Sequence, residues 1–185
     1  MFVEQTLKKN RALMDTAFRL HGSGQILPDS YVVDVDAFCS NGQKILEEAR
    51  KHHIKLYFML KQLGRNPYLA DKLVRMGYDG AVTVDFKEAQ TMMDHGIPIG
   101  NVGHLVQIPE SMVEKIVAYG PEVVTVYSLD KVRSIQQAAA RLQKCQGILL
   151  RVFDEGDMIY SGQTAGFPLS EVERTAETIR KEYPN

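Results

Sequence analysis

Lys61 follows directly after a short apolar segment, residues 56–60, and is followed by a polar loop. A uniform apolar run of this length is typical of a strand that is buried on both faces of a parallel sheet. A lysine at the carboxyl end of such a strand projects from the edge where α/β proteins bind ligands. A desolvated amine there can lose its proton and form an imine with an aldehyde such as pyridoxal phosphate. The alternative is a lysine that only solvates the end of a strand.

The loop after Lys61 contains groups that suit an anion. Arg65 is positively charged, and Asn66 precedes Pro67 where a helix can begin. The first backbone N–H groups of a helix can bind a phosphate. A plain connection between a strand and a helix would use the same residues for capping alone, so both interpretations stay open at this point.

Polar residues also follow the other predicted strands. His104 comes after Gly103, and an imidazole there could contact a planar cofactor or act as an acid or base. A loop histidine that is hydrogen-bonded to the backbone is the alternative. Thr83 and Tyr127 occupy corresponding positions after two further strands. Arg151 lies among apolar residues and needs a partner, either a carboxylate on a neighbouring strand or a ligand.

A repeated pattern of short apolar runs and longer helical stretches begins at residue 31. It predicts strands at residues 31–36, 55–60, 80–84, 98–102, 122–126 and 147–153. The regular spacing corresponds to one strand and one helix per unit. This alternation, with no Gly-rich phosphate loop, favours a (β/α) barrel over a doubly wound sheet.

The predicted fold is therefore α/β, a (β/α) barrel of the TIM type. Only about six of the eight units of a closed barrel fit into the chain. Residues 1–30 are predicted to form an N-terminal helix, over roughly residues 3–20, and a lead-in loop. Residues 31–185 are predicted to form the partial barrel domain. Either the chain is part of a longer protein, or a further segment or a second copy completes the barrel.

Several residues predict where the helices begin and end. Asn66 is a predicted cap with Pro67 as the first helical residue, and Gly77 ends that helix. Residues 85–88 and residues 170–173 resemble capping boxes, in which a short polar residue precedes a glutamate by three positions. Pro109 is predicted to begin another helix.

The composition is that of an ordinary soluble protein. The 185 residues are 44% hydrophobic and 24% charged, with a formal net charge of -1. Charges of both signs are interspersed, which argues against nucleic acid, and no apolar stretch is long enough to span a membrane. Cys39 and Cys145 fit no metal or disulfide spacing, and no histidine motif for a metal occurs. We therefore expect a cytoplasmic protein without a metal site.

Several segments of the chain match motifs of one known family. These are residues 33–37 (V-D-V-D-A) with Asn41, residues 59–61 (M-L-K), residues 80–84 (G-A-V-T-V) with 87–89 (K-E-A), residues 102–107 (V-G-H-L-V-Q) and residues 147–167. Together they resemble the alanine racemase N-terminal domain family, the fold type III enzymes that use pyridoxal phosphate. The match is closest to the YhfX-like branch, because residues 61–67, 103–109 and 162–167 fit its K-Q-x-G-R-N-P, G-H-L-V-Q-I-P and G-Q-x-x-G-F motifs.

This resemblance implies a pyridoxal-phosphate-dependent isomerase that acts on an amino acid and forms a Schiff base through Lys61. Lys61 and His104 are then the predicted catalytic residues. The predicted cofactor-binding residues are Lys61, Arg65, Asn66, Thr83, His104, Tyr127 and Arg151. The alternative within the same resemblance is a homeostasis protein that holds the cofactor without turnover.

The chain also departs from the racemase pattern. The motif K-A-N-A-Y-G-H-G is absent, and Thr164 replaces the arginine that meets substrate carboxylates in G-M-G-R-L-G-F. The last barrel strands and the C-terminal β domain of racemases, which supplies their second catalytic base, have no counterpart here. The resemblance therefore predicts Schiff-base formation more directly than racemisation, and relatives of this fold often form dimers.

Overall fold

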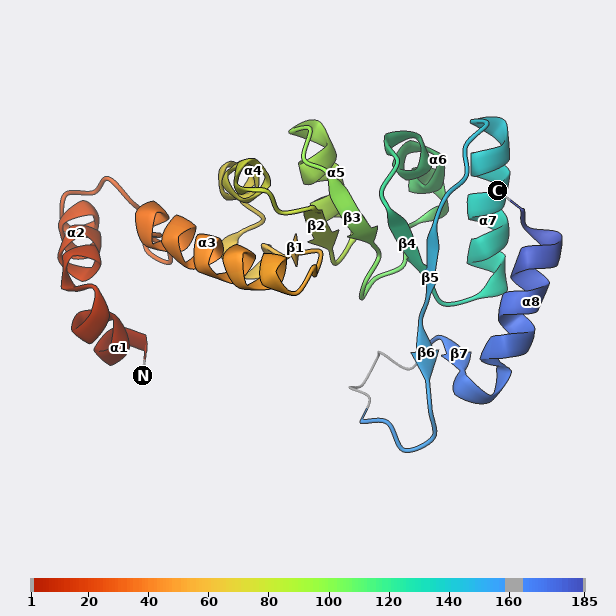
Figure 1. The fold of residues 1–185 in the computed structure, drawn as a ribbon. Coiled ribbons are helices and arrows are strands. Elements are labelled where there is room, and N and C mark those ends of the chain that lie inside the picture. Colours follow the sequence, from red (N-terminus) through yellow and green to blue (C-terminus); the bar gives the residue numbers. More distant parts are fainter. Residues whose placement is uncertain (1, 159–164, 185) are drawn as a thin grey trace. The chain divides into compact units, whose positions relative to one another are not determined.

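A parallel sheet of five strands forms the centre of the larger of two compact units, in this computed structural model (Figure 1). The structure describes residues 2–158 and 165–184. The units are Met1–His52 and His53–Asn185. The strands lie in chain order, namely β1 (Tyr57–Phe58), β2 (Gly80–Thr83), β3 (Ile99–Val102), β4 (Val123–Val126) and β5 (Ile148–Leu150). Consecutive parallel neighbours are the order of a (β/α) barrel, whereas a doubly wound sheet reverses its order. The predicted α/β class is confirmed.

One helix connects each pair of neighbouring strands. These helices are α4 (Pro67–Met76), α5 (Phe86–Asp94), α6 (Glu110–Tyr119) and α7 (Leu129–Arg141). Their predicted boundaries at Asn66, Gly77 and Pro109 are confirmed. The Asn66 side-chain oxygen accepts from the backbone N–H groups of Tyr68 and Leu69, at 2.9 and 3.3 Å. Gly77 ends the helix at a φ of 109°, a left-handed conformation that glycine adopts at little cost.

Substitution of Asn66 by alanine is expected to lower the free energy of unfolding by about 1 kcal/mol, because two N–H groups of α4 lose their acceptor. Urea denaturation would measure the loss. Asn66→Asp is the matched control, since a carboxylate accepts the same bonds, and it should retain most of the stability. Equal losses in the two variants would contradict the capping role.

The core lies between the sheet and its helices. Val102, Val124 and Val126 have no exposed surface, and neither has Ala89 of α5. Phe58 of β1 points to the same side, where its ring makes an edge contact with Tyr78 at 6.2 Å. Because side chains alternate along a strand, the opposite face carries a second set of residues, including Tyr57.

Tyr57 shows that the sheet is curved. Its hydroxyl donates to Glu122, which precedes β4, although β2 and β3 lie between. A Cβ atom at Gly100 of β3 would lie 2.2 Å from the Tyr57 ring. In a flat sheet β1 and β3 would be about 9 to 10 Å apart, two strand spacings, which this ring cannot cross. The strands therefore bend toward one another on this face, as in a barrel.

The predicted strand at residues 31–36 is wrong. The helix α3 (Val35–Lys51) begins within it, and Asp34 is its cap, accepting from the Ala37 N–H at 2.9 Å. A strand needs a neighbour to satisfy its backbone groups, whereas an aspartate can initiate a helix locally. The parallel sheet consequently begins at β1 and has five strands rather than six.

The predicted N-terminal helix is divided into two. Helices α1 (Phe2–Lys9) and α2 (Arg11–Gly22) are separated by Asn10. The Asn10 side-chain oxygen accepts from the Leu13 N–H at 3.0 Å, which begins a new helix instead of continuing the first. Its amide group donates to Asp34, so one side chain connects the two helices to the start of α3.

The carboxyl-terminal part differs from the sequence prediction in two respects. The predicted strand at 147–153 is interrupted at Arg151, giving β5 and β6 (Val152–Phe153), and β6 pairs in parallel with β7 (Phe167–Pro168). The predicted capping box at 170–173 is wrong, because a 3-10 turn, η2 (Leu169–Glu171), precedes α8 (Val172–Glu182) without a side-chain cap. None of the described helices has the length and apolar character needed to cross a membrane.

Candidate functional site

Lys61 lies at the carboxyl edge of the sheet, as the sequence predicts, but on a turn rather than on a strand. β1 ends at Phe58, and Lys61 begins the 3-10 turn η1 (Lys61–Leu63). The turn is closed by the Arg65 N–H, which donates to the Leu60 carbonyl at 2.9 Å. Lys61 is exposed, so its amine is in contact with solvent. The sequence predicts a desolvated amine, and the structure differs in this respect.

Arg65 connects this turn to the end of β2. Its backbone has a φ of 56°, the left-handed region that few non-glycine residues adopt. One guanidinium nitrogen lies 3.6 Å from the Asp85 carboxylate. The Arg65 Nε atom is buried and has no hydrogen-bond partner among the described residues. This donor is therefore available to an additional acceptor.

Glu88 is a buried carboxylate beside this turn. It is 1% exposed, and its Oε2 atom accepts from the Val84 N–H at 2.6 Å, just beyond the end of β2. The predicted cap at Asp85 is confirmed, since its side chain accepts from the Glu88 N–H at 2.8 Å. Burial raises the pKa of Glu88, while the Val84 hydrogen bond and the charges of Arg65 and Lys61 oppose that shift.

A second cluster joins His104, Tyr127 and Arg151 at the ends of three neighbouring strands. The Tyr127 hydroxyl donates to the His104 carbonyl at 2.8 Å. The Arg151 guanidinium lies over the Tyr127 ring, 5.7 Å from its centroid, at a cation–π distance. Burial raises the pKa of Tyr127, and the Arg151 charge lowers it. The Arg151 Nε atom, like that of Arg65, is buried without a partner.

A chain of hydrogen bonds runs across the sheet below this cluster. The Thr125 hydroxyl donates to the Asn101 side chain at 2.8 Å, and Thr83 donates to the Asn101 carbonyl at 3.2 Å. Gln107 donates to the Thr125 carbonyl at 3.0 Å, and its own side-chain oxygen is buried without a partner in the described part of the chain. Thr83 has no exposed surface, so its hydroxyl acts within the sheet in this structure.

The residues predicted from the sequence therefore gather along one edge. Lys61 and Arg65 follow β1, and Thr83 ends β2. The second cluster lies at the ends of β3, β4 and β5. Asn66 differs, because its oxygen caps α4. The buried side-chain atoms that lack a partner among the described residues also lie along this edge, namely Arg65 Nε, Arg151 Nε and Gln107 Oε1. Two guanidinium N–H donors suit the anionic oxygens of a phosphorylated cofactor such as pyridoxal phosphate.

Comparison with known proteins identifies the family of the chain. The model of the family "Alanine racemase, N-terminal domain" matches residues 33–184. The chain belongs to the alanine racemase N-terminal domain family. It is 47% identical over 169 residues to a protein of Escherichia coli (strain K12), "Uncharacterized protein YhfX", covering 91% of this chain and 44% of that protein. It therefore lies in the YhfX-like branch of the family.

Solved structures show the same fold at low identity. D-threonine aldolase from Filomicrobium marinum superposes with a TM-score of 0.65 at 19% identity, covering 80% of this chain and 39% of that one. Alanine racemase from Clostridium difficile 630 gives 0.55 at 21%, covering 80% and 37%. The chain thus spans less than half the length of the relatives that it matches.

Sequence reasoning missed three features of this racemase-family edge. Glu88 belongs to the predicted capping box and to the K-E-A motif, and neither of them predicts a buried carboxylate at the end of β2. Asn101 and Thr125 carried no motif of their own, because only the strand register brings them together. The motif at 162–167, which includes Thr164, lies for the most part outside the described residues.

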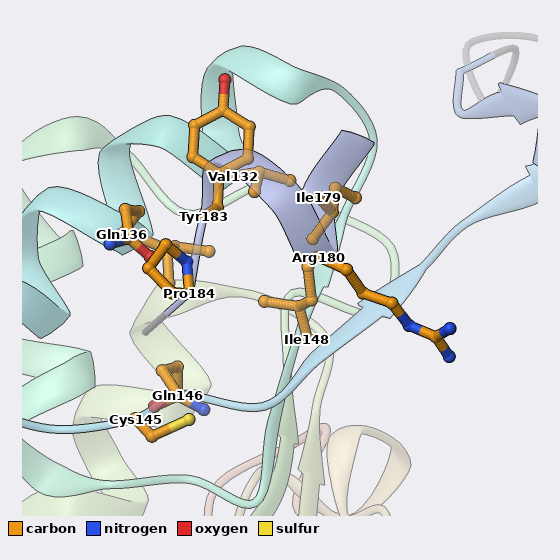
Figure 2. Close-up of a pocket in the computed structure, with 10 residues that line it drawn as sticks. Val132, Gln136, Cys145, Gln146, Ile148, Ile179, Arg180, Tyr183 and Pro184 are labelled. Atoms are coloured by element: carbon orange, nitrogen blue, oxygen red, sulfur yellow. The ribbon is translucent and has the colours of Figure 1, made fainter. Parts of the chain in front are cut away.

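Hollows lined by described residues lie beside the sheet in two places. One lies between α7, β5 and α8 and is lined by Val132, Ile135 and Ile179 (Figure 2). Gln146 at its rim precedes β5, so this hollow is near the amino end of the strand and away from Lys61. The other includes Tyr127 and lies beside β7 and α8, next to the second cluster. Only the second therefore adjoins the candidate site.

Proposed function

We propose that this chain is the cofactor-binding part of an amino acid racemase-like, pyridoxal-phosphate-dependent isomerase, with the cofactor held as a Schiff base on Lys61. The observation that carries the proposal is the place of Lys61, directly after the first strand of a racemase-family sheet. The unpartnered Nε atoms of Arg65 and Arg151 at the same edge support it. The motif K-Q-x-G-R-N-P around Lys61 adds the branch-specific signature.

The residues at the carboxyl edge of the sheet have different roles in binding the cofactor. Lys61 supplies the amine that bonds to the aldehyde, and its exposure leaves it accessible. Arg65 and Arg151 supply donors for anionic groups of the cofactor or of an amino acid substrate. Bound pyridoxal phosphate would supply an electron sink that makes the α-proton of an amino acid removable. The Lys61 amine, once released, would then take that proton on one face.

A second group is needed on the opposite face for racemisation. His104, the second predicted catalytic residue, is one candidate, and Tyr127, whose hydroxyl donates to the His104 backbone carbonyl, is another. The alternative function, a protein that holds pyridoxal phosphate without turnover, needs no such second group. An additional segment or a second copy of the chain would supply the missing group in the first case. We place the protein in the cytoplasm in both cases.

The test of Schiff-base formation uses the 185-residue chain and added pyridoxal phosphate. We expect a visible absorbance band that borohydride removes, and a pyridoxyl adduct that peptide mapping assigns to Lys61. An adduct spread over many exposed lysines, or no adduct, would contradict the proposal. Incorporation of deuterium at Cα of added amino acids then distinguishes the two functions, because a carrier catalyses no exchange.

A further inference from the structure

Arg151 and Tyr127 lie side by side on the inner face of the curved sheet, toward which the strands bend. Thr125 lies between two core valines of β4, so it points to this inner face, and it is paired with Leu149 of β5. Tyr127 and Arg151 each come two residues later on the same two chains, and side chains on one face of a strand recur every two residues. The Arg151 N–H donates to the Val126 carbonyl at 3.0 Å, so the pairing of the two chains continues to this point.

The Arg151 side chain is held at both ends of its length. Its guanidinium lies over the Tyr127 ring, 5.7 Å from the centroid. The backbone of Gly166 lies against the other end, because a Cβ atom there would be 2.5 Å from the Arg151 carbonyl oxygen and 2.9 Å from its Cγ atom. The Phe167 N–H also donates to the Arg151 carbonyl, at 2.8 Å. The contacts therefore fix the direction in which the side chain points.

The guanidinium of Arg151 has no acceptor for its N–H groups. It forms no hydrogen bond and no ion pair with any residue that the structure describes, and its Nε atom is buried without a partner. The two terminal nitrogens are not buried in this way, so they are accessible to a ligand. A guanidinium is a donor only, and its planar fork matches two oxygens of a carboxylate or a phosphate. The chemistry that fits this group is an oxyanion.

We propose that Tyr127 and Gly166 are positioning residues that orient Arg151 as an oxyanion-binding group, and that Tyr127 does so through its ring and not through its hydroxyl. The oxyanion is the carboxylate of an amino acid substrate or the phosphate of the cofactor. The inference rests on the proposed function for this ligand and deepens it by naming what orients Arg151. The Tyr127 hydroxyl donates to the His104 carbonyl, which leaves the ring for Arg151.

The first measurement uses the full chain without cofactor and follows the Arg151 Nε–H group by NMR while acetate or inorganic phosphate is added. We expect a saturable shift in the wild type and the same affinity in Tyr127→Phe, which retains the ring. Tyr127→Leu should bind the added anion about three- to tenfold more weakly, because the cation–π contact is lost. Gly166→Ala should also weaken binding, because its Cβ atom displaces the Arg151 side chain.

Tyr68→Leu is the matched control. It removes another tyrosine ring that contacts a cation, since Lys72 lies 5.1 Å from its centroid, and it should leave anion binding at Arg151 unchanged. Backbone amide spectra verify that each variant is folded. Gly166→Ala also strains the backbone, at a φ of 135°, so the two Tyr127 variants decide the matter if it does not fold.

Three results would overturn the inference. These are no saturable Arg151 shift with either anion in the wild type, equal affinities in the wild type and Tyr127→Leu, and equal losses in Tyr127→Phe and Tyr127→Leu. The last result would assign the role to the hydroxyl, as a second acid–base group at Tyr127 requires.

The second measurement distinguishes the two oxyanions by absorbance, in Arg151→Met and the wild type. Weaker binding of pyridoxal phosphate but not of pyridoxal, which lacks the phosphate, would identify the cofactor phosphate. Unchanged cofactor binding with a weaker spectral response to alanine, but not to ethylamine, would identify the substrate carboxylate. If Arg151→Met changes neither, the inference is wrong.

The two measurements also separate this inference from the proposed function. A wild type that shows the Arg151 anion response but forms no Schiff base on Lys61 would refute only the function. A Schiff base on Lys61 without any anion response at Arg151 would refute only the role of Arg151, Tyr127 and Gly166.

Discussion

Substitution of Lys61 by alanine is expected to abolish the borohydride-stable adduct with pyridoxal phosphate entirely. No other residue predicted to bind the cofactor carries a primary amine, so none of them can replace the covalent bond. The change should leave the fold intact, because Lys61 is exposed and its side chain makes no hydrogen bond among the described residues. We expect the free energy of unfolding to change by less than about 0.5 kcal/mol. Absorbance, peptide mapping and urea denaturation measure both effects.

Two further variants make this result specific. Lys87→Ala removes an exposed lysine from the first turn of α5 and should retain the adduct. Lys61→Arg retains the positive charge but has no amine that can form an imine. A band in Lys61→Arg equal to that of the wild type would show that the cofactor is bound without Lys61, and the proposed site would then be wrong.

Substitution of Gly100 by alanine is expected to destabilise the protein by about 1 to 3 kcal/mol, because the new Cβ atom overlaps the Tyr57 ring. The overlap is severe, at 2.2 Å from two ring carbons. The ring cannot move away freely, since its hydroxyl donates to Glu122. Urea denaturation measures the loss. Gly22→Ala is the control, because no atom lies within 4 Å of its added Cβ.

A double-mutant cycle tests whether the Tyr57 contact is the cause. Tyr57→Ala removes the ring, so Gly100→Ala should cost much less in that background than in the wild type. Additive losses would show that Gly100 is needed for another reason. This pair is informative about the fold, because the contact between Tyr57 and Gly100 exists only if the sheet is curved as in a barrel.

The candidate site illustrates what strand order alone can predict. A lysine, a threonine, a histidine and a tyrosine after successive parallel strands must lie along one edge, and Lys61, Thr83, His104 and Tyr127 do so. Whether each side chain is available at that edge depends on packing. Thr83 is fully buried and bonded to a backbone carbonyl, whereas Lys61 is exposed on a turn.

Two errors in the predicted elements have the same physical origin. The side-chain oxygens of Asn10 and Asp34 each accept a hydrogen bond from a backbone N–H group, and these bonds begin a new helix where a continuous helix or a strand is predicted. Hydrophobic periodicity does not predict such bonds, because each bond depends on a single polar atom and not on a pattern of apolar residues. The error at α8 is of another kind, because a 3-10 turn precedes the helix and no side-chain cap is formed.

The sequence by itself determined the α/β class, the positions of β2, β3 and β4, and the lysine at the end of the first sheet strand. These features follow from local signals, namely apolar runs, helix caps and a motif, which act over a few residues. Only the tertiary structure decided that Arg65 lies beside Asp85, that Arg151 lies over Tyr127, and that Tyr57 lies against Gly100. Such contacts join residues far apart in the chain, and they depend on strand register and sheet curvature, which a short sequence window does not contain.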